Sequence, residues 1–192
     1  MMKPGMSSSS LSGLSCAVLA LVGRGGATTP ELIEMGTRGS PFFWTSGESQ
    51  IYAEAKRLVE LGYLTPSKQP GKTRSRTRYE LTPVGLAALR RRLAEPAGFP
   101  RIQHEASFRL FAGDLIEDDA AILESLEGLR AELGQLEELL VQMDERAALY
   151  PHRERYIRLQ LSLGRRMVDA HRDWLDEIDE ALAPGARDRT VG

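Results

Sequence analysis

Four basic side chains recur at alternate positions in one short stretch of the sequence. The segment QPGKTRSRTRYELT, residues 69–82, contains Lys72, Arg74, Arg76 and Arg78 and no acidic residue before Glu80. Alternate side chains of a β-strand share one face, so these cations would line one side of a strand. Such a row neutralises phosphates and supplies affinity for nucleic acid without reading its sequence. The alternative is a solvated basic loop that has no partner.

A second set of side chains suited to nucleic acid lies just upstream, on a predicted helix from about Gly47 to Leu61. Apolar residues at helical spacing form its inner face. The remaining surface carries Ser49, Gln50, Tyr52, Ala53, Lys56 and Arg57. In the major groove, Gln50 can bond an adenine edge, and Lys56 or Arg57 can reach guanine or phosphate. Tyr52 either contacts the DNA backbone or packs half-buried.

Three predicted helices must position these side chains. Apolar spacing predicts the first helix over residues 11–22 and a short second helix over 31–36. Thr29, before Pro30, is the predicted cap of the second helix. Thr45 and Glu48 are predicted to form a capping box at the start of the third helix, which is the helix from about Gly47 to Leu61.

A predicted hairpin follows the third helix. Its strands cover residues 63–65 and 77–81, and Pro70-Gly71 makes the turn. Thr82-Pro83 then opens a fourth helix that ends near Pro96. Three helices followed by a two-stranded hairpin is the order of a winged helix-turn-helix, in which the hairpin is the wing.

The second half of the chain carries two apolar seams at heptad spacing. The first lies on a predicted helix of about 30 residues that starts near Asp118, and the second follows a bend at Pro151. The seam residues are Ile122, Leu126, Leu129, Leu133, Leu136, Leu140 and Met143, then Ile157, Leu161, Val168, Leu175 and Ile178. Two such helices form an antiparallel hairpin but rarely cover their own seams. We therefore expect these residues to pair with a second copy of the chain.

The predicted fold is mainly α with a small β-hairpin wing, and a long antiparallel helical hairpin follows the winged helix-turn-helix. The DNA-binding domain covers residues 11–95 and the dimerisation domain 96–183. Residues 1–10 and 184–192 are expected to be disordered tails. A twofold homodimer places two recognition helices one DNA turn apart, about 34 to 36 Å, which suits a near-palindromic double-stranded operator.

Charge is distributed unevenly along the 192 residues. Residues 1–95 hold 13 Lys and Arg against 7 Asp and Glu, and residues 96–192 hold 12 against 20, so charges of +6 and −8 make up the formal −2. The basic half suits a nucleic-acid partner. Cys16 is the one cysteine, which excludes an internal disulfide and favours a reducing cytoplasm. The apolar run over residues 14–22 is too short to cross a bilayer, so no membrane association is expected.

The sequence does not favour an enzyme. His104, His152 and His171 lie far apart, and no metal-ligand spacing joins them to carboxylates or to Cys16. The glycine-rich stretch over residues 23–26 lacks the lysine and the preceding strand of a phosphate-binding loop. We therefore expect no metal and no cofactor.

The segments GESQIYAEAKRLVELGYLT and GKTRSRTRYELTPVGLAALR resemble the PadR family of bacterial transcription regulators. The matching positions are Gln50, Ile51, Tyr52, Leu58, Gly62, Tyr79, Leu81, Thr82 and Gly85. FRLFAGDL (108–115), LQLSLG (159–164) and RDWL (172–175) resemble the C-terminal helical, Vir-type domain of such regulators. The chain departs from the family pattern at residues 28–32, which read TTPEL in place of HGYEL, and at Glu54, which adds a negative charge near the predicted DNA face.

The resemblance implies a homodimeric repressor, released by a small-molecule or stress signal. Some PadR-like proteins respond to phenolic acids or hydrophobic drugs. Phe108, Phe111, Tyr156 and Trp174 could border a pocket for such an effector between the wing domain and the helices, or they could be core residues. The rival function is a dimeric winged-helix adaptor that binds a protein without specific DNA binding. The basic wing favours DNA.

Overall fold

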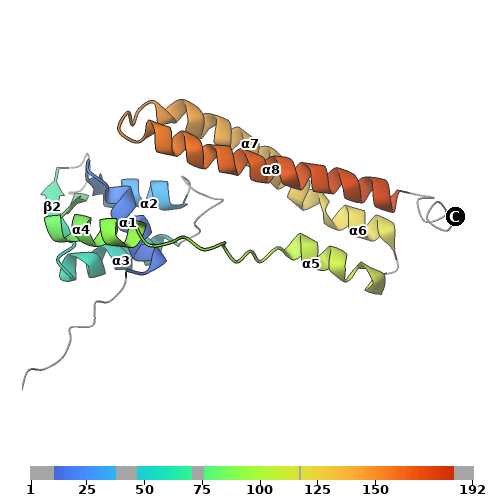
Figure 1. Cartoon of the computed structure of the whole chain (residues 1–192), viewed down its shortest axis with the longest axis horizontal. Coiled ribbons are helices and arrows are strands. Elements are labelled where there is room, and N and C mark those ends of the chain that lie inside the picture. Colours follow the sequence, from blue (N-terminus) through green and yellow to red (C-terminus); the bar gives the residue numbers. More distant parts are fainter. Residues whose placement is uncertain (1–10, 38–46, 71–75, 117, 184–192) are drawn as a thin grey trace, which may run out of the picture. The chain divides into compact units, whose positions relative to one another are not determined.

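The computed structural model describes residues 11–37, 47–70, 76–116 and 118–183. The chain divides into two compact units, Met1–Phe99 and Pro100–Gly192 (Figure 1). Both predicted tails, as well as Lys72 and Arg74, lie outside the described residues. No helix in the described part of the chain is long and apolar enough to cross a membrane.

The first unit contains the predicted helices and wing, with one extra strand. Its elements are α1 (Gly13–Val22), β1 (Ala27–Thr28), α2 (Thr29–Thr37), α3 (Glu48–Glu60), β2 (Leu64–Gln69), β3 (Arg76–Leu81) and α4 (Pro83–Leu93). The strands form an antiparallel sheet in the order β1-β3-β2. The winged helix-turn-helix prediction is therefore confirmed.

The strands differ in length from the prediction. β2 continues to Gln69, because it pairs along its whole length with β3, from Leu64 opposite Leu81 to Gln69 opposite Arg76. β1 was not predicted, since two residues are too few to show an alternating pattern. It pairs Ala27 with Tyr79 and so ties the connection between α1 and α2 to the wing.

The core of the first unit lies between the three helices and the sheet. Val18 and Leu19 of α1, Leu32 of α2, Leu58 of α3 and Tyr79 of β3 are all buried in one cluster. Burial of side chains of this size stabilises a fold by about 1.5 to 3 kcal/mol each. This core fixes the face of α3 that points inward.

Two glycines let backbone segments approach closely. A Cβ at Gly85 of α4 would lie 2.1 Å from the Tyr63 carbonyl oxygen. Next to it, the Thr82 hydroxyl donates to the Gly62 carbonyl at 2.7 Å and accepts from the Gly85 amide at 3.0 Å. The Thr82-to-Gly85 motif therefore locks the start of α4 against the end of α3. At Gly36 of α2, a Cβ would lie 2.5 Å from the Ile51 Cδ1 atom.

The first residues of α2 and α3 differ from the caps predicted from the sequence. The N-cap of α3 is Gly47, whose amide donates to the Gln50 Oε1 atom at 3.2 Å, whereas the predicted cap Thr45 lies outside the described residues. Thr29 is not the cap of α2, because the helix begins at Thr29 itself, and its hydroxyl donates to the Thr77 carbonyl of β3 at 3.4 Å. The Glu31 carboxylate instead accepts from the Thr28 amide at 2.7 Å, and this bond lowers the pKa of Glu31.

The second unit is a helical hairpin preceded by shorter helices. Its elements are α5 (Glu105–Phe111), a 3-10 turn (Gly113–Leu115), α6 (Asp119–Ser125), α7 (Glu127–Ala147) and α8 (Glu154–Leu182). α7 and α8 lie side by side, as Figure 1 shows, and the predicted antiparallel hairpin is confirmed. α5 was not predicted.

The single helix of about 30 residues predicted to start near Asp118 is wrong, because the helix is broken at Leu126. The Ser125 hydroxyl donates to the Ile122 carbonyl at 2.7 Å, and the Leu126 amide bonds the Leu123 carbonyl in a tight turn. The break turns the Leu126 side chain inward, where only 1% of it is exposed.

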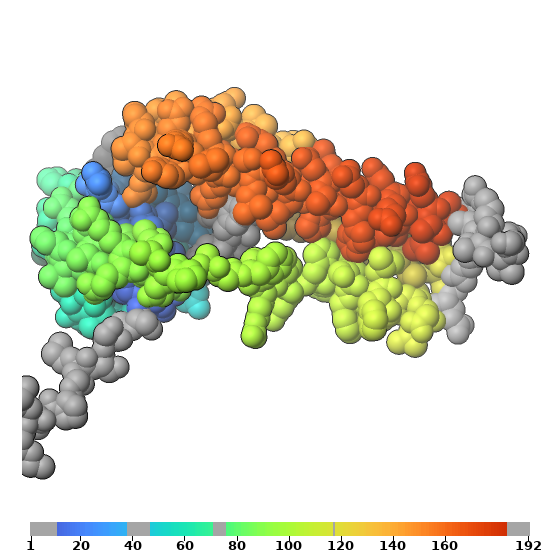
Figure 2. All heavy atoms as spheres, in the orientation of Figure 1, coloured from blue at the N-terminus to red at the C-terminus, as the bar shows by residue number. Residues whose placement is uncertain are grey.

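The apolar seams pack against each other within one chain. The buried seam residues are Ile122, Leu126, Leu133, Leu140, Leu161, Val168, Leu175 and Ile178. Leu129, Leu136 and Ile157 are half-buried. In the space-filling view, the side chains of α8, coloured orange to red, cover one side of the second unit (Figure 2). The buried members therefore leave no surface for a second chain to contact.

Candidate nucleic-acid interface

The exposed face of α3 carries the side chains that the sequence analysis assigned to DNA. Ile51, Ala55 and Leu58 are buried, and the helical period therefore turns the opposite face to solvent. The exposed residues are Ser49, Gln50, Tyr52, Ala53, Lys56 and Arg57. The Gln50 side chain both caps the helix through its Oε1 atom and keeps its amide nitrogen available as a donor.

Lys56 and Tyr52 form one exposed unit on α3. The Lys56 ammonium lies over the Tyr52 ring, 4.4 Å from its centroid, and the Tyr52 side chain is 43% exposed. A cation over a ring face is attracted to it and loses some of its freedom. Tyr52 thus orients the Lys56 charge on the solvent side of the helix.

Arg57 and Glu54 form a bidentate pair that reaches α1. The Arg57 guanidinium donates from Nε to Glu54 Oε2 at 2.9 Å and from Nη2 to Glu54 Oε1 at 2.7 Å. The Ser15 hydroxyl, buried on α1, donates to Glu54 Oε1 at 2.6 Å and accepts from Arg57 at 2.9 Å. The bonds from Arg57 hold the pKa of Glu54 below its ordinary value against the opposing effect of burial.

The β3 strand presents its cations on one face, as the alternation predicts. Tyr79 is buried, whereas Arg76 and Glu80 are exposed on the other side of the strand. Arg78 lies on that side too, but its guanidinium donates to the Gly25 carbonyl and lies 3.8 Å from the Glu80 carboxylate. Of these two arginines, Arg76 is the one whose side chain is open to solvent.

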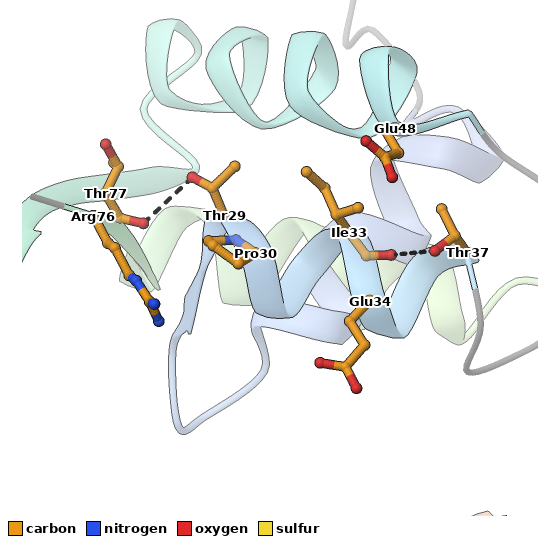
Figure 3. A pocket seen from close by; sticks show the side chains of 8 residues that line it. All are labelled: Thr29, Pro30, Ile33, Glu34, Thr37, Glu48, Arg76 and Thr77. Atoms are coloured by element: carbon orange, nitrogen blue, oxygen red, sulfur yellow. Dashed lines mark hydrogen bonds between the residues drawn. The ribbon is translucent and has the colours of Figure 1, made fainter. Parts of the chain in front are cut away.

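A pocket of about 530 Å³ joins the start of α3 to the wing strand (Figure 3). Its lining residues are Thr29, Pro30, Ile33, Glu34, Thr37, Glu48, Arg76 and Thr77. Glu48 of α3 and Arg76 of β3 therefore belong to one continuous surface across α2. The sequence analysis did not anticipate this hollow, since it depends on how three elements meet.

Solved structures share the fold of this chain, although no family model and no curated protein matches it. Bacillus subtilis PadR in complex with operator DNA is 21% identical over 88% of this chain and 98% of its own, with a TM-score of 0.73. The Vibrio cholerae virulence activator AphA is 21% identical over 86% and 95%, with a TM-score of 0.65. B. subtilis PadR in complex with p-coumaric acid is 22% identical over 87% and 99%, with a TM-score of 0.59.

This chain has the PadR fold. The structural match extends over both units, so the resemblance stated from the quoted segments is confirmed for the fold as a whole. Within that PadR fold, α3 is the third helix of the winged helix-turn-helix and the β2-β3 hairpin is its wing. The proteins named above are regulators and not enzymes. In the described part of the chain, no group of three or more His, Cys, Asp or Glu residues could hold a metal ion.

Three of the four aromatic residues predicted for an effector pocket are exposed in the second unit. Phe108, Phe111 and Tyr156 are 69%, 84% and 68% exposed, so they are not core residues of this chain. Trp174 is half-buried and forms a T-shaped contact with the His104 ring, with 5.3 Å between the ring centroids. Their role in binding an effector stays a prediction.

His104 and His171 join α5 to α8 in the second unit, although they lie 67 residues apart in sequence. Their Nε2 atoms are 2.9 Å apart. His104 Nδ1 accepts from the Ser107 amide, and His171 Nδ1 lies 2.6 Å from the Met167 carbonyl. These partners assign a neutral pair, in which His104 Nε2 donates to His171 Nε2. Burial, followed by the nearby His171, lowers the pKa of His104.

Proposed function

We propose that the chain is a sequence-specific DNA-binding transcriptional regulator. The observation that carries the proposal is the shared surface of α3 and β3, where Gln50 and Lys56 are exposed and Arg76 lies across the pocket from Glu48. A helix of this kind can enter the major groove while a wing contacts phosphate. The operator complex of B. subtilis PadR, a protein of the same fold, supports this function.

Within this proposal, α3 reads bases and the wing supplies affinity. The Gln50 amide is suited to an adenine edge, and Ser49, Ala53 and Lys56 lie on the same exposed face. Arg76 is assigned to phosphate, together with Lys72 and Arg74 in the wing segment outside the described residues. Tyr52 is assigned to the DNA backbone, because its ring holds Lys56 at the surface.

We further infer that the regulator acts as a homodimer on a near-palindromic operator. Three apolar side chains of α8, Tyr156, Leu159 and Leu163, are 68%, 62% and 51% exposed and follow helical spacing. An exposed apolar stripe of this kind favours an interface. This stripe and the half-buried residues of the predicted seam together give a second copy of the chain an apolar surface to contact. The buried seam residues cannot do so.

Repression and release by a ligand complete the proposed function. B. subtilis PadR, which shares the fold, has been solved with p-coumaric acid, and this supports a small phenolic or hydrophobic effector here. Release requires that the effector bind more tightly to the form that does not fit the operator. Since its DNA lies in the cytoplasm, we place the protein there.

A binding selection tests the function directly. The purified chain would be used to enrich duplexes from a random pool and from DNA upstream of its own gene, and affinity would then be measured at two salt concentrations. We expect a near-palindromic consensus with a steep salt dependence. If no consensus emerges and affinity stays weak at both salt concentrations, the adaptor function, with a protein as partner, replaces this one.

A further inference from the structure

The bonds around Arg57 separate it from the other cations of α3. Its guanidinium faces Glu54, whose side chain is only 10% exposed, and it also reaches Ser15, which is fully buried. Lys56, the next residue back along the chain, is directed instead toward the Tyr52 ring on the solvent side. Neighbouring cations on one helix thus have different partners.

Moving Arg57 to a DNA phosphate would leave Glu54 without its principal partner. A carboxylate this deeply buried needs a counter-charge or several donors to remain ionised, and Ser15 supplies only one bond. The Glu54 charge would then face the DNA with little compensation. Kept in place, the pair neutralises that charge and links α3 to α1 at a buried point.

We propose that Arg57 is a positioning residue, which fixes the rotation of α3 against α1 through Glu54 and Ser15 and does not itself contact DNA phosphate. This inference rests on the proposed function. It also changes how Glu54 is understood, since this residue, which departs from the family pattern, is neutralised by Arg57 and hydrogen-bonded by the buried Ser15.

The decisive experiment compares Arg57→Gln with the double variant Glu54→Gln plus Arg57→Gln, using a duplex recovered by the selection above. Affinity would be measured by fluorescence anisotropy across a series of salt concentrations. We expect Arg57→Gln to lower affinity about tenfold with an unchanged salt slope. The double variant should regain most of that loss, because two neutral amides and Ser15 can bond one another with no buried charge left over.

Lys56→Gln is the matched control on the same helix. Loss of a cation that does contact phosphate should flatten the salt slope by about one unit, and Glu54→Gln should not restore it. If Arg57→Gln behaves as Lys56→Gln does, Arg57 is a phosphate contact and the inference is wrong. Arg57→Lys gives a second test, because it keeps the charge but not the bidentate geometry. The positioning role predicts that this variant loses affinity for the duplex, whereas a phosphate contact predicts near-normal affinity.

Thermal unfolding separates this inference from the proposed function. The positioning role predicts that Arg57→Gln lowers the melting temperature and that adding Glu54→Gln restores it, whether or not DNA is bound. The wild-type chain, the two single variants Arg57→Gln and Glu54→Gln and the double variant form a double-mutant cycle. If the wild-type chain binds no duplex but the effects of the two substitutions on the melting temperature are not additive, the regulator function fails while the structural role of Arg57 stands. If the effects of the two substitutions on the melting temperature simply add, the inference is wrong, whatever the DNA-binding result.

Discussion

The cations of α3 and the wing fall into two groups according to their partners. Arg57 and Arg78 are held by groups of the first unit, namely the Glu54 carboxylate and the Gly25 carbonyl. Lys56 and Arg76 are turned to solvent. Only charges that reach the DNA displace counterions, so substitutions in the two groups should differ in their salt dependence.

Substitution of Arg76 tests the wing. We expect Arg76→Gln to weaken binding to all duplexes alike and to flatten the slope of log K against log salt by about one unit, because one phosphate contact is lost. Titration against selected and random duplexes at several salt concentrations measures this. Arg155→Gln, which removes an exposed charge from α8, is the control and should leave the slope unchanged. An unaltered slope in Arg76→Gln would remove this part of the wing from the interface.

Gln50 has a structural role in capping α3 and a proposed role in recognition, and the two can be separated. Gln50→Ala should cost about 1 to 3 kcal/mol of binding at the selected site and little on random DNA. It also removes the acceptor for the Gly47 amide, so Gln50→Glu is the matched control, since it keeps an acceptor there but not the amide donor. Competition assays with both duplexes measure the difference. Equal losses on both would assign Gln50 to positioning.

The histidine pair predicts a loss of stability at acidic pH. The pKa of His104 is lowered by burial and then by His171, so the unfolded chain takes up the proton more readily. Stability from this contact is therefore complete above the unfolded value of about 6.5 and decreases as pH falls below it. Trp174 emission in a Trp44→Phe background should follow the change, because the His104 ring touches Trp174. His152→Gln, at an exposed histidine, should leave the profile unchanged, whereas His104→Gln should flatten it.

Among the elements, the start of α4 is held by a close backbone approach. Thr82 bonds the end of α3, and Gly85 leaves no room for a side chain against Tyr63. The same pair of residues appears in the sequence as a motif before an apolar helix. The structure gives the motif a physical reason, since it sets the angle between the wing and α4.

Gly85→Ala should destabilise the first unit by about 1 to 3 kcal/mol, because its Cβ would lie 2.1 Å from a backbone oxygen. Gly134→Ala in α7 is the control. It meets nothing within 4 Å and lies within a helix, so it should stabilise the chain by about 0.5 to 1 kcal/mol. Thermal unfolding followed by circular dichroism measures both. A stable Gly85→Ala variant would mean that α4 can shift without cost.

Periodicity was enough to predict the helices of the wing domain and the helical hairpin. It could not predict β1, which exists only because β3 offers it a partner, nor the break at Leu126, where side-chain burial overrides a continuous apolar pattern. α5 was missed because it is short and buries no residue.

The candidate site was predictable as a set of exposed positions on α3 but not as a set of contacts. Spacing alone cannot tell that Arg57 turns back to Glu54 and Ser15, which lie 3 and 42 residues away. The one available signal was the pairing of Glu54 with Arg57 at helical spacing of three, which often makes an ion pair. Likewise, heptad spacing cannot distinguish a seam within one chain from a seam between two.

In the molecule as a whole, two units have opposite charge and different tasks. The excess of cations falls before residue 96 and the excess of acids after it. Under the proposed function, the acidic helical unit would be repelled by DNA and the basic unit attracted to it. The proposed dimer would form through apolar surface, and the stripe on α8 is a surface of that type.

Disruption of that stripe should give monomers that remain folded. We expect Leu159→Asp plus Leu163→Asp to abolish dimers, since two charges would be buried in an apolar interface. Sedimentation measures the assembly and circular dichroism the fold. Leu133→Asp is the contrasting variant: its side chain is 4% exposed within one chain, so it should unfold the hairpin. Dimers that persist in the double variant would place the interface elsewhere.

The bond from Arg78 to the Gly25 carbonyl has a consequence for genetics. Under the proposed function, a screen for alleles that fail to repress would recover Arg78 substitutions beside those of Lys56 and Arg76, because the bond holds the loop at Gly25 to the wing. The two kinds of allele should differ in the cell. Loss of a DNA contact leaves the protein at normal abundance, so that it forms inactive mixed dimers with the wild-type protein and the allele is dominant. Loss of the loop bond lowers the abundance of the protein and leaves the allele recessive.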